Sequence, residues 1–298
     1  ILGHGWWLKD EAKMSKSIGN VVRPLPLVAD FGADALRWFL LREIPLGLDG
    51  SFSDEALLER TNADLANNVG NLFSRVTALI AKLPDSKVPD AAPIVDEVLE
   101  PIAAASHALY VMSFSKHEPS SALRAVVDWA DALNKFLVRT EPWRRAGRET
   151  ECDRVLRTAA GHLAHIALRL HPATPVAAGR LLAALGFETD PARLVAPGED
   201  LFARTAWPVV GRTVRAGEAV FPRLDRGIIA ATTAAAAGAG PGTGPARPEP
   251  ETRKKARSGE KPSSPTAAPT PAPEPDLIEY DDFARVKLRV GKVVVCEK

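Results

Sequence analysis

Over most of the chain, apolar residues recur every three to four positions, the spacing that gathers side chains on one face of an α-helix. The longest such stripe starts after Ser53, a residue type that caps helix N-termini, and runs to Leu83, before Pro84 and Asp85. The pattern therefore predicts a single long helix over 54–83. Shorter stripes predict further helices at 33–43, 94–112, 121–139, 151–170 and 175–185, the last closed by Gly186.

The two ends of the chain show other patterns. Residues 1–8 form an apolar and aromatic run, which predicts a buried strand followed by a turn at 9–11. Residues 280–298 alternate with period two on both sides of Gly291, which predicts two strands of a β domain. The chain also opens on Ile1 and stops inside this second strand, so we expect a piece of a larger protein.

Composition separates the helical part from the β part. No aromatic residue occurs between Phe221 and Tyr280, and the interval is rich in Ala, Thr, Gly and Pro. Such a segment buries too little apolar surface to offset the entropy lost on ordering, so residues 227–276 are expected to form a disordered or extended linker. Its basic cluster is expected to be solvated, with weak phosphate contact as the alternative; the cluster comprises Arg253, Lys254, Lys255 and Arg257.

Charge and cysteine content narrow the class of protein. Lys plus Arg number 38 and Asp plus Glu 37, which excludes a polyanion binder that is basic throughout but leaves room for a local basic face. The two cysteines, Cys152 and Cys296, lie far apart, which excludes a disulfide framework and a closed cysteine-rich zinc site, and fits a reducing compartment. The sequence contains no apolar run as long as a membrane span and does not open on a signal peptide, so we expect a cytoplasmic protein.

Candidate chemistry lies just after the predicted first strand. Lys13-Met14-Ser15-Lys16-Ser17, the KMSKS loop, is followed by Gly19 and Asn20. Two lysines three residues apart can converge on one polyphosphate, where ammonium groups offset the charge that grows on phosphoryl oxygens. For lysines at this spacing in general, the more frequent explanation is a solvated loop.

The identity of the pentapeptide favours the first explanation, because it matches the second signature of the class I aminoacyl-tRNA synthetases. The residues around it resemble the methionyl-tRNA synthetases of that class. The similarity covers about 1–224, is densest over 1–80, and is carried by residues 4–7, 19–22, 30–43, 62–67, 70–72, 141–143 and 221–223.

The resemblance implies a methionine–tRNA ligase, which uses ATP with Mg²⁺ to make methionyl-adenylate and transfers the methionyl group to tRNA-Met. It assigns catalytic roles to Lys16 first and Lys13 second, through contacts with the triphosphate of ATP. Ser15 and Ser17 are expected to shape the loop and contact phosphate, and His4 to support the nucleotide pocket.

A second site is implied on the predicted long helix. Asn71 and Arg75 lie four residues apart and so share one helix face, beside the apolar stripe. An amide and a guanidinium can read base edges, and an aromatic ring such as that of Trp143 can stack on an unstacked base. The resemblance implies that these three residues bind the CAU anticodon, whereas Asn134 and Arg139 are expected to be structural.

The fold class implied is mainly α. Residues 1–52 would be the end of a Rossmann-type catalytic core with the KMSKS loop and a stem-contact region, and 53–226 a helical anticodon-binding bundle. The Ala/Pro-rich linker at 227–276 would then lead to 277–298, the truncated start of an OB-fold β-barrel that adds tRNA affinity. Partners would be tRNA-Met, methionine and ATP, without a membrane, and the OB-fold domain could form a homodimer.

The sequence departs from the family in several ways. The first ATP signature, the methionine pocket and the insertion that could hold zinc are not found, so we expect no activity from this chain alone and no metal site in it. Ile18 stands where a basic residue is common, and the histidines at 162, 165 and 171 have no partners that would complete a metal set. Two alternatives stay open: a non-catalytic tRNA-binding protein, and a class I synthetase for leucine, valine or cysteine.

Overall fold

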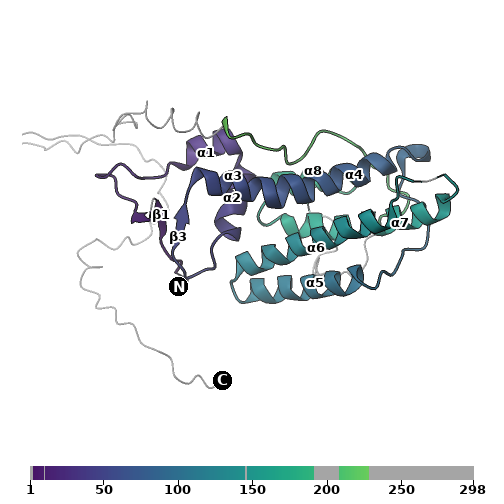
Figure 1. The fold of residues 1–298 in the computed structure, drawn as a ribbon, viewed down its shortest axis with the longest axis horizontal. Helices are drawn as coiled ribbons and strands as arrows, with labels where there is room; N and C mark the ends of the chain where they lie inside the picture. Colours follow the sequence, from purple (N-terminus) through teal and green to yellow (C-terminus); the bar gives the residue numbers. More distant parts are fainter. Residues whose placement is uncertain (1–2, 10, 145, 191–207, 228–298) are drawn as a thin grey trace, which may run out of the picture. The chain divides into compact units, whose positions relative to one another are not determined.

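The computed structural model describes residues 3–9, 11–144, 146–190 and 208–227, and this part of the chain is mainly helical, as predicted (Figure 1). A small sheet and two short helices come first, and a bundle of longer helices follows. The predicted β domain, and the predicted linker beyond Gly227, lie outside the described residues.

The sheet has three short strands in the order β2-β1-β3. Strand β1 (Trp7–Lys9) pairs antiparallel with β2 (Ala12–Lys13) and parallel with β3 (Gly50–Phe52). The prediction of a buried strand over 1–8 is therefore wrong in extent and in burial. The strand begins only at Trp7 and is half-buried, and Trp6 is 61% exposed, because so small a sheet offers few neighbours to cover the apolar run.

Two helices pack against this sheet. Helix α2 (Ala33–Arg42) confirms the helix predicted at 33–43, and its Phe39 ring lies 5.6 Å from the Trp7 ring and 5.5 Å from the Phe52 ring, centroid to centroid. Helix α1 (Pro24–Phe31) was not predicted, because prolines at positions 24 and 26 suggest a break. Proline is tolerated in a first turn, where backbone N–H groups have no intrahelical acceptor, so the two prolines start this helix.

The long helix predicted over 54–83 is present as a continuous rod of three segments: α3 (Asp54–Arg60), η1 (Thr61–Gly70) and α4 (Asn71–Ile80). The Ser53 hydroxyl accepts the N–H of Ala56 at 3.0 Å, which confirms the predicted cap. Unlike the prediction, η1 is a π-helix. In a π-helix the backbone hydrogen bonds span five residues instead of four. Such segments are rare and are often found at functional sites.

Four further helices complete the bundle: α5 (Leu99–Ser115), α6 (Pro119–Thr140), α7 (Glu149–Leu170) and α8 (Pro175–Ala184). Three match their predicted ranges closely. Helix α5 starts later than the predicted residue 94, because the Asp96 carboxylate accepts the N–H groups of Val98 and Leu99 and marks the start there. Gly186, with φ at +76°, closes α8 as predicted.

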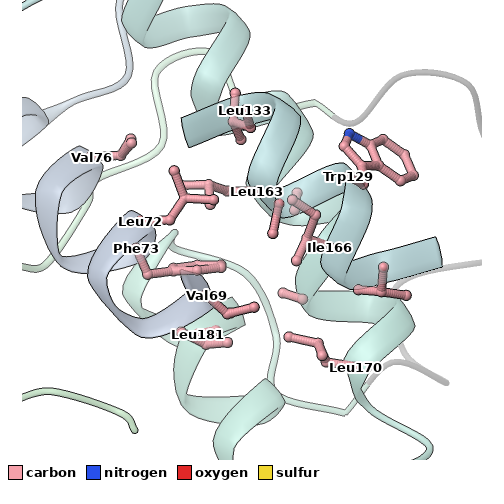
Figure 2. Close-up of a cluster of buried hydrophobic side chains, with 14 of the residues drawn as sticks. Val69, Leu72, Phe73, Val76, Trp129, Leu133, Leu163, Ile166, Leu170 and Leu181 are labelled. Atoms are coloured by element: carbon pink, nitrogen blue, oxygen red, sulfur yellow. The ribbon is translucent and has the colours of Figure 1, made fainter. Parts of the chain in front are cut away.

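The core of the bundle lies between α4, α6, α7 and α8 (Figure 2). Apolar side chains of η1 and α4 point from one side and those of α6, α7 and α8 from the others; the labelled members are Val69, Leu72, Phe73, Val76, Trp129, Leu133, Leu163, Ile166, Leu170 and Leu181. Since close-packed interiors resist displacement, this core fixes the orientation of α4 and therefore of the side chains on its outer face.

A buried charge cluster joins α2 to the π-helical segment. The Asp64 carboxylate lies 3.4 Å from Nε of Arg42 and 3.8 Å from Nη1 of Arg60, and it accepts the indole N–H of Trp38 at 3.3 Å. Burial raises the pKa of Asp64, and the two guanidinium groups oppose that rise. The cluster connects the sheet-bearing part of the chain to the bundle through charge as well as packing.

Candidate nucleotide and RNA contact sites

The KMSKS loop leaves the sheet edge at β2. Lys13 is the last residue of that strand, paired with Leu8 of β1, and residues 16–19 form the turn that follows. The backbone N–H of Gly19 donates to the carbonyl of Ser15 at 3.0 Å, and Gly19 adopts φ of +78°, a conformation that favours glycine. The loop is thus a closed turn on the surface of the sheet.

Asn20 braces this turn from its base. Its side-chain oxygen accepts the backbone N–H of Ser15 at 2.7 Å, and its amide nitrogen donates to the carbonyl of Lys13 at 3.1 Å. Within the turn, the hydroxyls of Ser15 and Ser17 share a hydrogen bond of 2.8 Å, in agreement with their predicted loop-shaping role. The sequence showed Asn20 only as a flanking residue, and its adjacency to Gly19 is the signal that could have indicated a turn.

The two lysines have different surroundings. The Lys13 ammonium lies 3.9 Å from the centroid of the Trp6 ring, a cation–π contact that the sequence did not predict. Lys16 is exposed, and among the described residues its ammonium makes no hydrogen bond or ion pair. Lys16 therefore presents its charge to solvent, where an anionic ligand can reach it.

His4, the predicted nucleotide-pocket residue, is exposed, and its Nδ1 lies 2.7 Å from the carbonyl oxygen of Gly5. It lines a pocket of about 210 Å³ between the sheet, α2 and the loop after it; the other lining residues include Trp7, Leu40, Ile44, Leu48 and Pro119. The lysines of the loop do not line this pocket, but Trp6, whose ring the Lys13 ammonium contacts, does. The role of His4 stays a prediction.

The second predicted site is brought together in space. The Arg75 guanidinium carbon lies 5.3 Å from the centroid of the Trp143 ring, although the two residues come from different segments. Asn71, one turn before Arg75 on α4, is exposed. We call Asn71, Arg75 and Trp143 the recognition surface. It offers an amide, a guanidinium and an aromatic face to solvent, the groups used to bind unstacked bases.

The end of α6 explains the position of Trp143. Helix α6 stops at Thr140, and Glu141 turns the chain with φ of +44° in the left-handed region. Pro142, which cannot continue a helix, is buried, whereas the following Trp143 is 42% exposed. The buried proline anchors the turn and leaves the indole at the surface.

Asn134 and Arg139 have the structural roles predicted for them. Asn134 donates to the side-chain oxygen of Asn68 in η1 at 2.8 Å. The Arg139 guanidinium contacts both oxygens of Asp96, at 2.7 and 2.9 Å. Although burial would raise the pKa of Asp96, hydrogen bonds from the Leu99 backbone and from Arg139 lower it.

The histidines of α7 belong to a polar network inside the bundle. The Trp129 indole donates to Nδ1 of His162 at 3.0 Å, which leaves Nε2 of His162 to donate to Glu100 at 3.3 Å. This hydrogen bond lowers the pKa of Glu100. His165 stacks on Trp129 at 5.5 Å between ring centroids. In the described ranges, no group of three His, Cys, Asp or Glu side chains is placed to hold a metal ion.

Known proteins are similar to this chain in sequence and in structure. A family model described as class I tRNA synthetases (M) matches residues 1–77. The methionine–tRNA ligase of Halalkalibacterium halodurans is 35% identical over 310 residues, spanning 100% of this chain and 42% of the relative. That of Caldanaerobacter subterraneus is 33% identical over the same shares of both proteins.

A solved structure agrees. Mycobacterium tuberculosis methionyl-tRNA synthetase in complex with methionyl-adenylate matches with a TM-score of 0.64 and 32% identity, over 74% of this chain and 43% of that one. Along its whole length, the chain is similar to methionine–tRNA ligases. It spans about two fifths of the length of the relatives that it matches. Among the helices described, none is both long and apolar enough to cross a bilayer.

Proposed function

We propose that this chain is part of a methionine–tRNA ligase that activates methionine with ATP and transfers the methionyl group to tRNA-Met. In the first step a methionine carboxylate oxygen attacks the α-phosphorus of ATP, methionyl-adenylate forms, and pyrophosphate leaves. In the second step the methionyl group passes to the terminal adenosine of the tRNA, and AMP leaves. The observation that carries the proposal is the similarity of the whole chain to methionine–tRNA ligases. The exposed KMSKS loop and the recognition surface support it.

In the activation step, Lys16 and Lys13 stabilise the negative charge that develops on the departing pyrophosphate. A preorganised ammonium group contributes most where charge grows in the transition state. Lys16 already faces solvent, whereas Lys13 must exchange its contact with the Trp6 ring for one with phosphate. Ser15 and Ser17 hold the turn and donate to phosphate oxygens, and His4 supports the nucleotide from its own pocket.

The resemblance implies two metals: Mg²⁺, which accompanies ATP, and zinc, which belongs to a separate insertion. ATP enters as its Mg²⁺ complex, and the ion neutralises part of the triphosphate charge. We expect the zinc-bearing insertion, the methionine pocket and the first ATP signature in the part of the relatives that has no counterpart in this chain.

In tRNA selection, the recognition surface binds the CAU anticodon. Trp143 supplies a ring on which one base stacks, while Asn71 and Arg75 hydrogen-bond to base edges. The OB-fold segment at 277–298 would add sequence-independent affinity and a homodimer contact, and the bundle at 53–226 would be the anticodon-binding domain. We place the enzyme in the cytoplasm, where its three substrates meet.

Amino-acid-dependent ATP–pyrophosphate exchange by the full-length gene product, run with each of the twenty amino acids, tests the proposal. We expect exchange with methionine alone. Exchange driven by leucine, valine or cysteine would assign the chain to another class I synthetase. The absence of exchange with every amino acid, with tRNA binding retained, would favour the non-catalytic tRNA-binding alternative.

A further inference from the structure

The KMSKS loop is held in shape by a residue outside its signature. Asn20 joins both ends of the turn: it accepts from the N–H of Ser15 at 2.7 Å and donates to the carbonyl of Lys13 at 3.1 Å. Because the carboxamide has one acceptor and one donor arm, only one orientation of the side chain satisfies both bonds. The chain from Lys13 to Asn20 is thereby closed into a ring.

The backbone at each lysine is held by this closed loop, while the Lys13 ammonium also contacts the Trp6 ring. Lys13 is fixed on one side by the pairing of β2 with β1 and on the other by its carbonyl bond to Asn20. Lys16 lies inside the turn between Ser15, whose N–H is held by Asn20, and Gly19, whose N–H returns to the Ser15 carbonyl. The Asn20 amide is therefore the one side chain, among the residues described, that bonds to the backbone on both sides of Met14.

We propose that Asn20 is a positioning residue that sets the relative placement of the Lys13 and Lys16 ammonium groups for a triphosphate. The inference rests on the proposed function of the loop. Asn20 contacts no reacting atom; it reduces the number of loop conformations, so less ordering entropy is lost when the two lysines converge on the same ligand. An aspartate at this position would keep the acceptor, lose the donor and add a negative charge near the phosphates.

The test uses the full-length protein with two measurements on Asn20→Ala. The first is the hydrogen exchange of the Ser15 backbone amide without ligand, which we expect to accelerate at least about tenfold when its acceptor is removed. The second is methionine-dependent ATP–pyrophosphate exchange, where we expect kcat to fall about ten- to a hundredfold because the catalytic groups are misplaced. The KM for methionine should stay within about twofold of wild type, because the methionine pocket is not touched.

Ile18→Ala is the matched control. Ile18 lies in the same turn and is 71% exposed, and its side chain has no polar atom to lose. We expect this variant to keep both the amide protection and the kcat of the wild type. Asn20→Asp, which retains the acceptor, should keep most of the Ser15 protection and still lower kcat.

Three results would overturn the inference: wild-type kcat in Asn20→Ala, unchanged exchange of the Ser15 amide in that variant, or a loss of methionine affinity as large as the loss of kcat. The last would show that Asn20 acts through the fold as a whole. A wild-type protein without methionine-dependent exchange would instead refute the proposed function. The amide measurement would then still report whether the Asn20 hydrogen bonds form.

Discussion

Arg75 of α4 and Trp143, just beyond the end of α6, are in contact at the surface of the bundle, with the guanidinium carbon 5.3 Å from the indole centroid. Trp143 stays 42% exposed with this contact in place, and the contact holds its ring beside Arg75 of α4. A base that stacks on Trp143 would therefore meet a ring already in place, with the Arg75 hydrogen-bond donors alongside.

Replacement of Trp143 by alanine should weaken tRNA charging without affecting amino-acid activation. Loss of one base–aromatic stack costs about 1–3 kcal/mol, so kcat/KM for aminoacylation should fall roughly five- to 150-fold. Trp143→Phe keeps a π-face and should retain most of the activity. Aminoacylation and pyrophosphate exchange are measured side by side. An equal fall in both would mean that the indole supports the fold and not recognition.

Lys16→Ala should impair amino-acid activation and leave tRNA binding intact, the reverse of the effect expected for Trp143→Ala. We expect the rate of pyrophosphate exchange to fall about ten- to a thousandfold, because an electrostatic contact that strengthens in the transition state is lost, while tRNA affinity changes little. Lys135→Ala is a suitable control, since this bundle lysine forms only an exposed pair with Asp131 at 2.7 Å. A Lys16 variant with unchanged exchange kinetics would remove this residue from the catalytic set.

The charge cluster around Asp64 predicts a large effect on stability. Asp64→Asn keeps the size and an acceptor for Trp38 but leaves Arg42, which is only 5% exposed, without its counter-charge. Removal of one partner from a buried pair costs about 3–5 kcal/mol of unfolding free energy, measurable by urea denaturation. Asp131→Asn, in the exposed pair with Lys135, should cost less than about 1 kcal/mol. Similar values for the two variants would contradict a structural role for the cluster.

The lowered pKa of Asp96 predicts that the unfolding free energy depends on pH. Its pKa is lowered in the folded state, so it contributes stability that is fully present above the ordinary aspartate value near pH 4 and is lost as pH falls through the lowered value. Asp96→Asn, which still caps α5 but cannot pair with Arg139, should be less stable than wild type by about 0.5–1 kcal/mol at pH 7. Unfolding free energies between pH 2 and 7 should show this difference shrinking in acid. A difference independent of pH would exclude the ion pair as its source.

All the longer helices could be predicted from the sequence, because their stability comes from apolar stripes that the sequence displays directly, whereas the short α1 was missed. The cap at Ser53 and the stop at Gly186 are equally local features, and they were confirmed. The π-helical turns at Thr61–Gly70 could not be predicted, since the apolar stripe there differs little from that of an α-helix. The first strand was overextended because an apolar run does not reveal how many neighbours will cover it.

The candidate sites were predictable to different degrees. Lys13 and Lys16 could be found from the signature alone, and the positions of Asn71, Arg75 and Trp143 from the resemblance. The hydrogen bonds of Asn20 and the contact of Lys13 with Trp6 could not, because they depend on how the turn closes in three dimensions. These contacts hold the backbone of the loop and the Lys13 ammonium, and only the structure reveals them.

The uninterrupted helix from Asp54 to Ile80 has a mechanical consequence. At 1.5 Å per residue it is a stiff spacer of about 40 Å. Its π-helical segment is fixed to α2 through Asp64 and Arg42, and the α4 segment that follows carries Asn71 and Arg75. Insertion or deletion of a single residue between these points would turn the outer face about the helix axis relative to the sheet-bearing segment. The helix thus sets the distance and the direction between the sheet-bearing segment and the surface that carries Asn71 and Arg75.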